Sequence, residues 1–142
     1  MEAIEQPQLL GLEVPELALR RRAPDKLTVR QLATWAAHQI GNIARITGVN
    51  RRSEVFVLSQ AVKLSEEVGE LHAEILGHLK MQRTDKAQNF DTDSLASEFA
   101  DVIMSAAVLS QSLGIDLTRA LQTKMATVDE RMAAYNATRL SG

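Results

Sequence analysis

Residues 53–80 read SEVFVLSQAVKLSEEVGELHAEILGHLK and form the longest amphipathic segment of the chain. Ser53 is a favourable N-cap residue, and Glu54 suits the positive start of a helix. Apolar side chains recur at steps of three and four residues, which is the period of one helix face. These apolar positions are Leu64, Val68, Leu71, Ile75 and Leu79. The segment therefore predicts a long helix with one apolar face.

Three further segments show the same period and predict helices over residues 28–48, 93–114 and 116–136. All three prolines precede residue 25, and aromatic residues make up only 4% of the chain, which favours helices over strands. The polar stretch 82–93 predicts a loop. We therefore expect an all-α fold: a four-helix bundle-like domain over residues 28–142, preceded by an irregular N-terminal arm over residues 1–27.

The composition excludes several classes of protein. A chain of 142 residues is the size of one domain, and its formal net charge of −2 is not the basic surface expected of a nucleic-acid-binding protein. Without cysteine there is no disulfide, no thiolate metal site and no cysteine nucleophile. No apolar run approaches the ~20 residues of a membrane helix, and the first eight residues do not resemble a signal peptide. We expect a cytoplasmic protein that binds neither nucleic acid nor membrane.

The predicted helix over residues 53–80 carries an acidic arc beside its apolar face. Successive residues of a helix are rotated by about 100° around its axis. On this basis the charged side chains between residues 63 and 74 all fall within one arc that spans roughly 100° of the helix surface. They are Lys63, Glu66, Glu67, Glu70 and Glu74. Glu67 lies about 40° from Leu71 and therefore sits at the edge of the apolar face.

The segment 93–114 repeats this pattern with Glu98 and Asp101, which are neighbours because they are three residues apart. If the two helices pack antiparallel, the two acidic edges face each other and repel. A divalent cation relieves that repulsion, and oxygen ligands without Cys or His suit Mg²⁺ or Mn²⁺. An acidic motif on a helix is also common as a solvated face. From the residues alone, both a metal site and a solvated face remain open.

Two segments taken together resemble a known family. Residues 63–71 read KLSEEVGEL and residues 98–103 read EFADVI. This pair resembles the signature of the MazG-like all-α nucleoside triphosphate pyrophosphohydrolases, in which E-E-x-x-E is followed after a variable gap by E-x-x-D. The gap here covers residues 71–97, and the resemblance extends over about residues 53–135.

The resemblance implies an activity and a set of metal ligands. The reaction would split a nucleoside triphosphate into the monophosphate and pyrophosphate, as housecleaning of the nucleotide pool. By the resemblance, Glu67, Glu70, Glu98 and Asp101 bind Mg²⁺, with Mn²⁺ as an alternative. Glu66 and Glu67 are the catalytic candidates, and Glu66 would orient the attacking water or hold an additional metal.

Basic residues are the candidates for binding substrate. Lys63 either contacts a phosphate or pairs with Glu67, and the sequence favours neither. Lys124 and Arg131 match a family pattern, K-x-x-x-N-x-x-R, as phosphate or intersubunit contacts. Val128 stands where that pattern has Asn, which puts a side-chain amide contact in doubt.

Other interpretations remain beside this one. A non-enzymatic helical interaction protein would use the acidic arc only as a solvated face. A phosphoribosyl-ATP pyrophosphohydrolase resembles the same pattern, but those enzymes tend to carry a histidine close after E-x-x-D, and none follows here. Trp35 suits the core or an interface better than stacking on a base. Unpartnered apolar surface, together with the resemblance, predicts a homo-oligomer, either a dimer or a tetramer.

Overall fold

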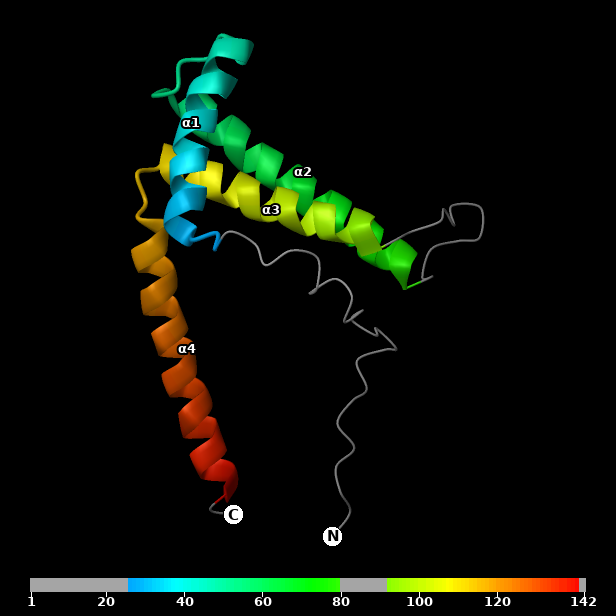
Figure 1. The fold of residues 1–142 in the computed structure, drawn as a ribbon, viewed down its shortest axis with the longest axis vertical. Helices are drawn as coiled ribbons and strands as arrows, with labels where there is room; N and C mark the ends of the chain where they lie inside the picture. The colour runs from blue at the N-terminus through cyan, green and yellow to red at the C-terminus, as the bar shows by residue number, and fades with distance from the viewer. Residues whose placement is uncertain (1–25, 80–91, 141–142) are drawn as a thin grey trace.

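The computed structural model describes residues 26–79 and 92–140, so the predictions for residues 1–25 and for most of the polar stretch 82–93 lie outside the described residues. The described residues form four helices and no strand, which confirms the all-α prediction (Figure 1). The helices are α1 (Val29–Thr47), α2 (Glu54–His78), α3 (Thr92–Ser112) and α4 (Leu117–Leu140).

The helix starts follow from local side-chain chemistry. Thr28 caps α1 in a capping box, since its Oγ1 accepts from the Gln31 amide at 3.2 Å and Gln31 Oε1 accepts from the Thr28 amide at 2.8 Å. The Ser53 Oγ accepts from the Phe56 amide at 3.2 Å and caps α2. At the start of α4, Asp116 Oδ1 accepts from the Arg119 amide at 3.0 Å. These caps satisfy amide donors that have no partner inside the helix.

Two glycines end helices in the left-handed conformation. Gly48, with φ of 70°, follows α1, and Gly114, with φ of 69°, follows α3. A side chain at either position would be strained, so glycine stops each helix and turns the chain. The predicted helix ends hold to within a few residues, except that α4 continues four residues beyond the expected residue 136.

The body of the molecule consists of α1, α2 and α3. α2 and α3 run antiparallel side by side, and α1 crosses α3 (Figure 1). Ala36 of α1 and Ala107 of α3 are fully buried, and their small size allows the two helices to approach closely. Phe56 near the start of α2 is also fully buried. This packing fixes the acidic edge of α2 against that of α3.

α4 departs from the four-helix bundle that we expected. The bend between α3 and α4 is 114°, far from the near reversal that would lay α4 along α3. Only the start of α4 contacts α1 and α3, and the rest projects from the body (Figure 1). Every side chain from Arg119 to Arg139 is exposed. A single chain therefore forms a three-helix body with a projecting fourth helix.

No single helix in residues 26–79 and 92–140 is long and apolar enough to cross a membrane. α3 and α4 meet those criteria of length and composition only when they are taken together as a bent pair.

Removal of the α2 cap tests the account of how this helix begins. Ser53→Ala leaves the Phe56 amide without its side-chain acceptor, and we expect a loss of about 1 kcal/mol in the free energy of unfolding. Thr34→Ala is the control, because Thr34 lies inside α1, is exposed, and only bonds back to the Arg30 carbonyl. Urea titration of both variants measures the difference. An equal effect of the two substitutions would contradict the capping role of Ser53.

Candidate metal centre

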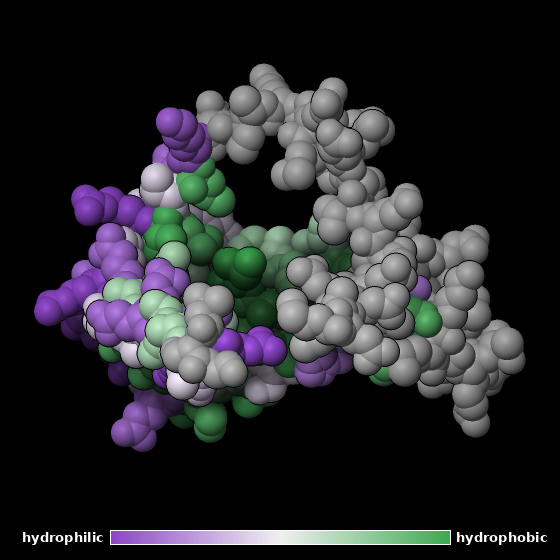
Figure 2. Space-filling view, turned by 90° about the horizontal axis from the view of Figure 1, so that it is seen from below, coloured by the Kyte–Doolittle hydropathy of each residue, from purple (hydrophilic) through white to green (hydrophobic). Residues whose placement is uncertain are grey.

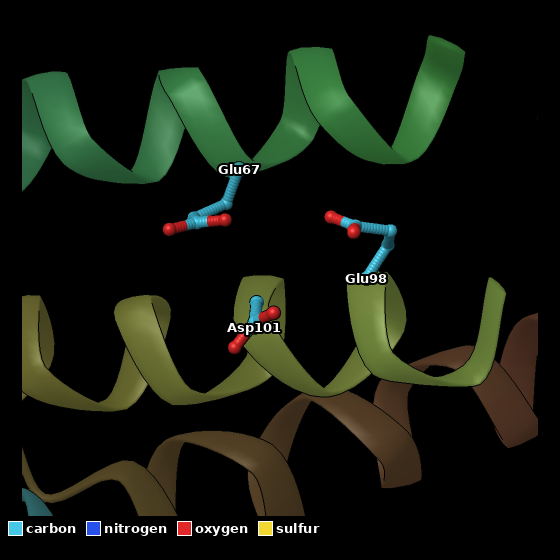
Figure 3. A group of neighbouring side chains, drawn as sticks. All are labelled: Glu67, Glu98 and Asp101. Carbon is cyan, nitrogen blue, oxygen red and sulfur yellow. The ribbon is translucent and has the colours of Figure 1, made fainter. Parts of the chain in front are cut away.

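Three carboxylates converge between α2 and α3. Glu67 extends from α2 toward Glu98 and Asp101 on α3, and one oxygen from each lies within 4.8 Å of the others (Figure 3). Glu67 is buried, while Glu98 and Asp101 are half-buried. Three negative groups this close, and partly removed from water, repel one another strongly.

The helix geometry explains why these three residues meet. Glu67 stands one helical turn before the buried Leu71, so it borders the face of α2 that packs on α3. Glu98 and Asp101 share one side of α3 because they are three residues apart. α2 and α3 run antiparallel, and this brings the acidic edge of α2 against the acidic edge of α3. The sequence predicted this arrangement for the case in which the two helices pack antiparallel.

Two carboxylate oxygens in this region are buried without a partner. Glu98 Oε2 and Glu74 Oε1 have no hydrogen-bond donor among the described residues. A buried carboxylate oxygen without a donor is costly, and a bound cation would remove that cost. A set of three carboxylates with no sulfur or imidazole ligand suits Mg²⁺ or Mn²⁺. The donors present therefore fit a hard divalent cation.

Glu74 was not expected to take part in this environment. It shares the acidic arc of α2 but follows the E-E-x-x-E segment by one turn. Its half-buried position and its unpartnered oxygen extend the acidic edge beyond that segment. The sequence contained a sign of this position, because Glu74 follows Glu67 by seven residues. That spacing is close to two helical turns, so the two side chains lie on nearly the same side of the helix.

Glu70 lies beside the three converging carboxylates rather than among them. Its side chain is exposed, and the pKa of its carboxyl is raised, chiefly by the negative charge of Glu67. Desolvation, a hydrogen bond with Glu67 and the charges of Glu66 and Glu98 act in the same direction. The sequence placed Glu70 among four equivalent ligands, whereas the structure brings together the other three.

Lys63 partly neutralises the acidic edge. Its ammonium Nζ lies 2.7 Å from Glu67 Oε1 and 3.3 Å from Glu66 Oε2. These contacts, with the Glu67 hydrogen bond as the largest cause, raise the pKa of Lys63. The sequence left open whether Lys63 pairs with Glu67, and in the structure it does. Glu66 is the more exposed of its two partners and extends toward solvent.

A cavity of about 200 Å³ lies next to the carboxylates, between α1, α2 and α3. Lys63 and Asp101 belong to its lining, so the cavity and the acidic cluster share an edge. The remaining lining residues are Trp35, Gln39, Ile43, Gln60, Met104, Ser105 and Val108. The polar members of this set were not predicted from the sequence, although a glutamine such as Gln60 on an otherwise apolar helix face is a recognisable signal.

Lys124 and Arg131 do not join the site in a single chain. Both are exposed on α4, which carries them away from the α2–α3 pair (Figure 1). Val128, which lies between them in the same pattern, is also exposed. The expectation that these residues contact a phosphate therefore finds no support within one chain.

The family model for the MazG nucleotide pyrophosphohydrolase domain matches residues 57–134, which is more than half of the 142-residue chain. The matched range contains the three converging carboxylates and all of α3. Comparison with curated proteins and with solved structures gives no match.

Removing a charge beside the cluster should stabilise the metal-free protein. Glu70→Gln keeps the size of the side chain while removing a negative charge that Glu67 repels, so the melting temperature in EDTA should rise. Glu130→Gln removes a charge from the exposed part of α4 and should change the melting temperature much less. Differential scanning calorimetry compares the two. A lower melting temperature for Glu70→Gln would show that the repulsion is not significant.

A divalent cation should stabilise the folded state through the same carboxylates. A ligand that binds only the folded protein adds about 2.7 kcal/mol at 100 times its Kd. The melting temperature should therefore rise with millimolar Mg²⁺, and the rise should disappear in Asp101→Asn. An unchanged melting temperature of the wild-type protein would count against a preformed site.

Proposed function

The chain belongs to the MazG nucleotide pyrophosphohydrolase family, and on that premise we propose that it hydrolyses nucleoside or deoxynucleoside triphosphates to the monophosphate and pyrophosphate in a Mg²⁺-dependent reaction. A housecleaning role in the nucleotide pool of the cytoplasm is part of this proposal. Mn²⁺ is an alternative cation, because it also prefers oxygen ligands.

The convergence of Glu67, Glu98 and Asp101 is the observation that carries this proposal. A helical interaction protein has no need to hold three carboxylates within 4.8 Å at a half-buried helix interface, where each opposes folding. The unpartnered Glu98 oxygen adds to the same cost. A site that binds a cation offsets this cost whenever the cation is present.

The proposed roles follow from position. Glu67, Glu98 and Asp101 would hold the cation, and Glu70 is a further ligand within electrostatic reach of Glu67. The cation would neutralise phosphate charge and make the attacking water more acidic. Glu66, whose carboxylate is exposed beside the cluster, would accept a proton from that water.

Lys63 would change partners during binding. In the structure its ammonium group neutralises Glu67 and Glu66. With a cation held by Glu67, Glu98 and Asp101, the Lys63 ammonium would no longer be needed to neutralise Glu67 and would be available to a phosphate oxygen. Lys63 also lines the cavity, so a short movement keeps it between the carboxylates and the substrate.

The cavity between α1, α2 and α3 is proposed to receive the base. At about 200 Å³ it is below the ~300 Å³ at which pockets begin to hold a whole drug-sized ligand, so it suits only part of a nucleotide. Trp35 offers an aromatic face at the cavity, and Gln60 and Gln39 offer amides for hydrogen bonds. The triphosphate would extend from this cavity toward Lys63 and Asp101.

We also propose that the chain forms a homo-oligomer, either a dimer or a tetramer. In the described residues only five apolar side chains are buried, whereas sixteen large hydrophobic side chains are exposed. So much exposed apolar surface usually marks an interface.

Isosteric neutralisation of the cluster tests the proposed activity. Glu67→Gln and Asp101→Asn retain side-chain size but replace a carboxylate with an amide, which is a poorer ligand for a hard cation. We expect kcat to fall by roughly 100-fold or more in each, as when one transition-state contact is removed from other enzymes. Pyrophosphate release from a panel of ribo- and deoxynucleoside triphosphates with Mg²⁺ measures the loss.

Glu130→Gln is the matched control, because it removes one carboxylate from the exposed surface of α4. It should retain wild-type kcat. Equal activity of all three variants would reject the assigned site. The absence of pyrophosphate release from every nucleotide by the wild-type protein would favour the interaction-protein alternative.

A further inference from the structure

Two primary amides belong to the lining of the cavity next to the carboxylates, those of Gln39 on α1 and Gln60 on α2. Hydrophobic side chains gather on the hollowed surface on the side from which α4 projects (Figure 2). In apolar surroundings, a few well-placed polar groups decide which ligand a cavity accepts. An amide presents either its carbonyl oxygen or its NH₂ group, so the orientation of each amide determines what it can bind.

A chain of hydrogen bonds along α1 fixes the orientation of the Gln39 amide. Arg45 Nη2 donates to Asn42 Oδ1 at 2.9 Å, and Asn42 Nδ2 donates to Gln39 Oε1 at 3.2 Å. A guanidinium group can only donate, so it must face the oxygen of Asn42. The NH₂ group of Asn42 then faces Gln39, whose oxygen accepts. Gln39 Nε2 has no acceptor within residues 26–79 and 92–140, so its protons are available to a ligand.

A second pair of hydrogen bonds orients the Gln60 amide on α2. Ser59 Oγ donates its single proton to the Phe56 carbonyl at 2.7 Å, so this oxygen can only accept from Gln60. Gln60 Nε2 donates to it at 3.2 Å, and Gln60 Oε1 has no donor in the described part of the chain. Because Gln60 is buried, its free oxygen favours a ligand that can donate a hydrogen bond.

We propose that Asn42 and Arg45 are positioning residues, which hold Gln39 as a hydrogen-bond donor to an acceptor atom on the edge of the substrate base. Gln60 Oε1 would accept from a donor on the same edge. This inference rests on the proposed function, which assigns the cavity to the base, and specifies how the base is recognised. Neither Asn42 nor Arg45 lines the cavity, and Arg45 is exposed, so both would act through Gln39 rather than touch the substrate.

The orientation of Gln39 has a consequence for the choice between amino and keto bases. Cytosine has an amino donor beside a ring acceptor, whereas uracil has a carbonyl acceptor beside a ring N–H donor. Adenine and hypoxanthine differ in the same way. A donor fixed at one place in the cavity therefore distinguishes the two bases of each pair. An exchange of that donor for an acceptor must change the preference.

The orientation of Gln39 is tested first, in protein without substrate or metal. Asn42→Asp replaces the NH₂ donor with an acceptor, so the Gln39 amide should turn over and donate from Nε2 to the new carboxylate. In ¹⁵N–¹H NMR its side-chain amide signals, assigned by their loss in Gln39→Met, should move downfield and exchange more slowly with water.

Arg45→Glu should invert Gln39 as well. Asn42 would then donate to the new carboxylate and present its own oxygen to Gln39 Nε2. Arg45→Lys keeps a side chain that can only donate and should leave the Gln39 signals as they are in the wild type. Unchanged Gln39 signals in both Asn42→Asp and Arg45→Glu would overturn the role of the hydrogen-bond chain.

Base selectivity is measured next, as the ratio of kcat/KM for dCTP to that for dUTP and of dATP to that for dITP, with Mg²⁺. Asn42→Asp and Arg45→Glu should both change the ratio in the same direction. The change should be about tenfold or more, which is the effect of leaving one buried polar group unpaired. Arg45→Lys should retain the wild-type ratio.

Asn50→Asp is the matched control. It adds the same charge between α1 and α2, and the bond that Asn50 Oδ1 accepts from the Arg52 amide at 3.0 Å survives because a carboxylate still accepts. Its ratio and kcat should equal those of the wild type.

The outcomes separate the two proposals. An inverted Gln39 amide with unchanged ratios would overturn recognition of the base by Gln39. A change of ratio in Asn50→Asp equal to that in Asn42→Asp would do the same, because added charge alone would explain it. If the wild type released no pyrophosphate from any nucleotide, the proposed function would be contradicted. The NMR result would still decide whether Asn42 and Arg45 orient Gln39.

Discussion

The repulsion among carboxylates across the α2–α3 contact is the constraint to which the rest of the structure responds. Glu67, Glu98 and Asp101 come within 4.8 Å because α2 and α3 pack antiparallel with their acidic edges facing. Lys63 offsets part of the charge by pairing with Glu67 at 2.7 Å, but Glu98 still holds a buried oxygen without a donor among the described residues. The folded body is thus organised around a cluster of carboxylates whose repulsion a bound divalent cation would relieve.

The small core of a single chain connects stability with assembly. α1 and α3 pack closely through Ala36 and Ala107, yet α4 is exposed from Arg119 to Arg139. An isolated helix gains little stability in water, so most of the stability of α4 must come from packing against another surface. In the proposed homo-oligomer, a second copy of the chain would supply that surface.

Local chemistry explains which parts of this arrangement the sequence predicted. Thr28, Ser53 and Gly114 are cap residues whose effect depends on a few neighbours, so the helix starts and stops were predicted within a few residues. The facing of Glu67 with Glu98 and Asp101 was predicted because helical spacing places each beside an apolar face.

Features set by tertiary geometry were not predicted. The 114° bend after α3 depends on the packing of whole helices, and a helical period does not encode it, so the expected bundle was not found in one chain. The cavity beside Asp101 needs three helices to define it. The separation of Glu70 from the three converging carboxylates depends on side-chain direction at the helix edge, which spacing alone does not give.

The central claim is that these carboxylates form a metal site for a nucleotide. Anomalous diffraction from crystals soaked in Mn²⁺ with a non-hydrolysable α,β-imido deoxynucleoside triphosphate tests it most directly. The account predicts a Mn²⁺ peak at oxygen-coordination distance from Glu67, Glu98 and Asp101, with the triphosphate oxygens completing the coordination. Full occupancy of the nucleotide elsewhere, with no Mn²⁺ peak between α2 and α3, would contradict it.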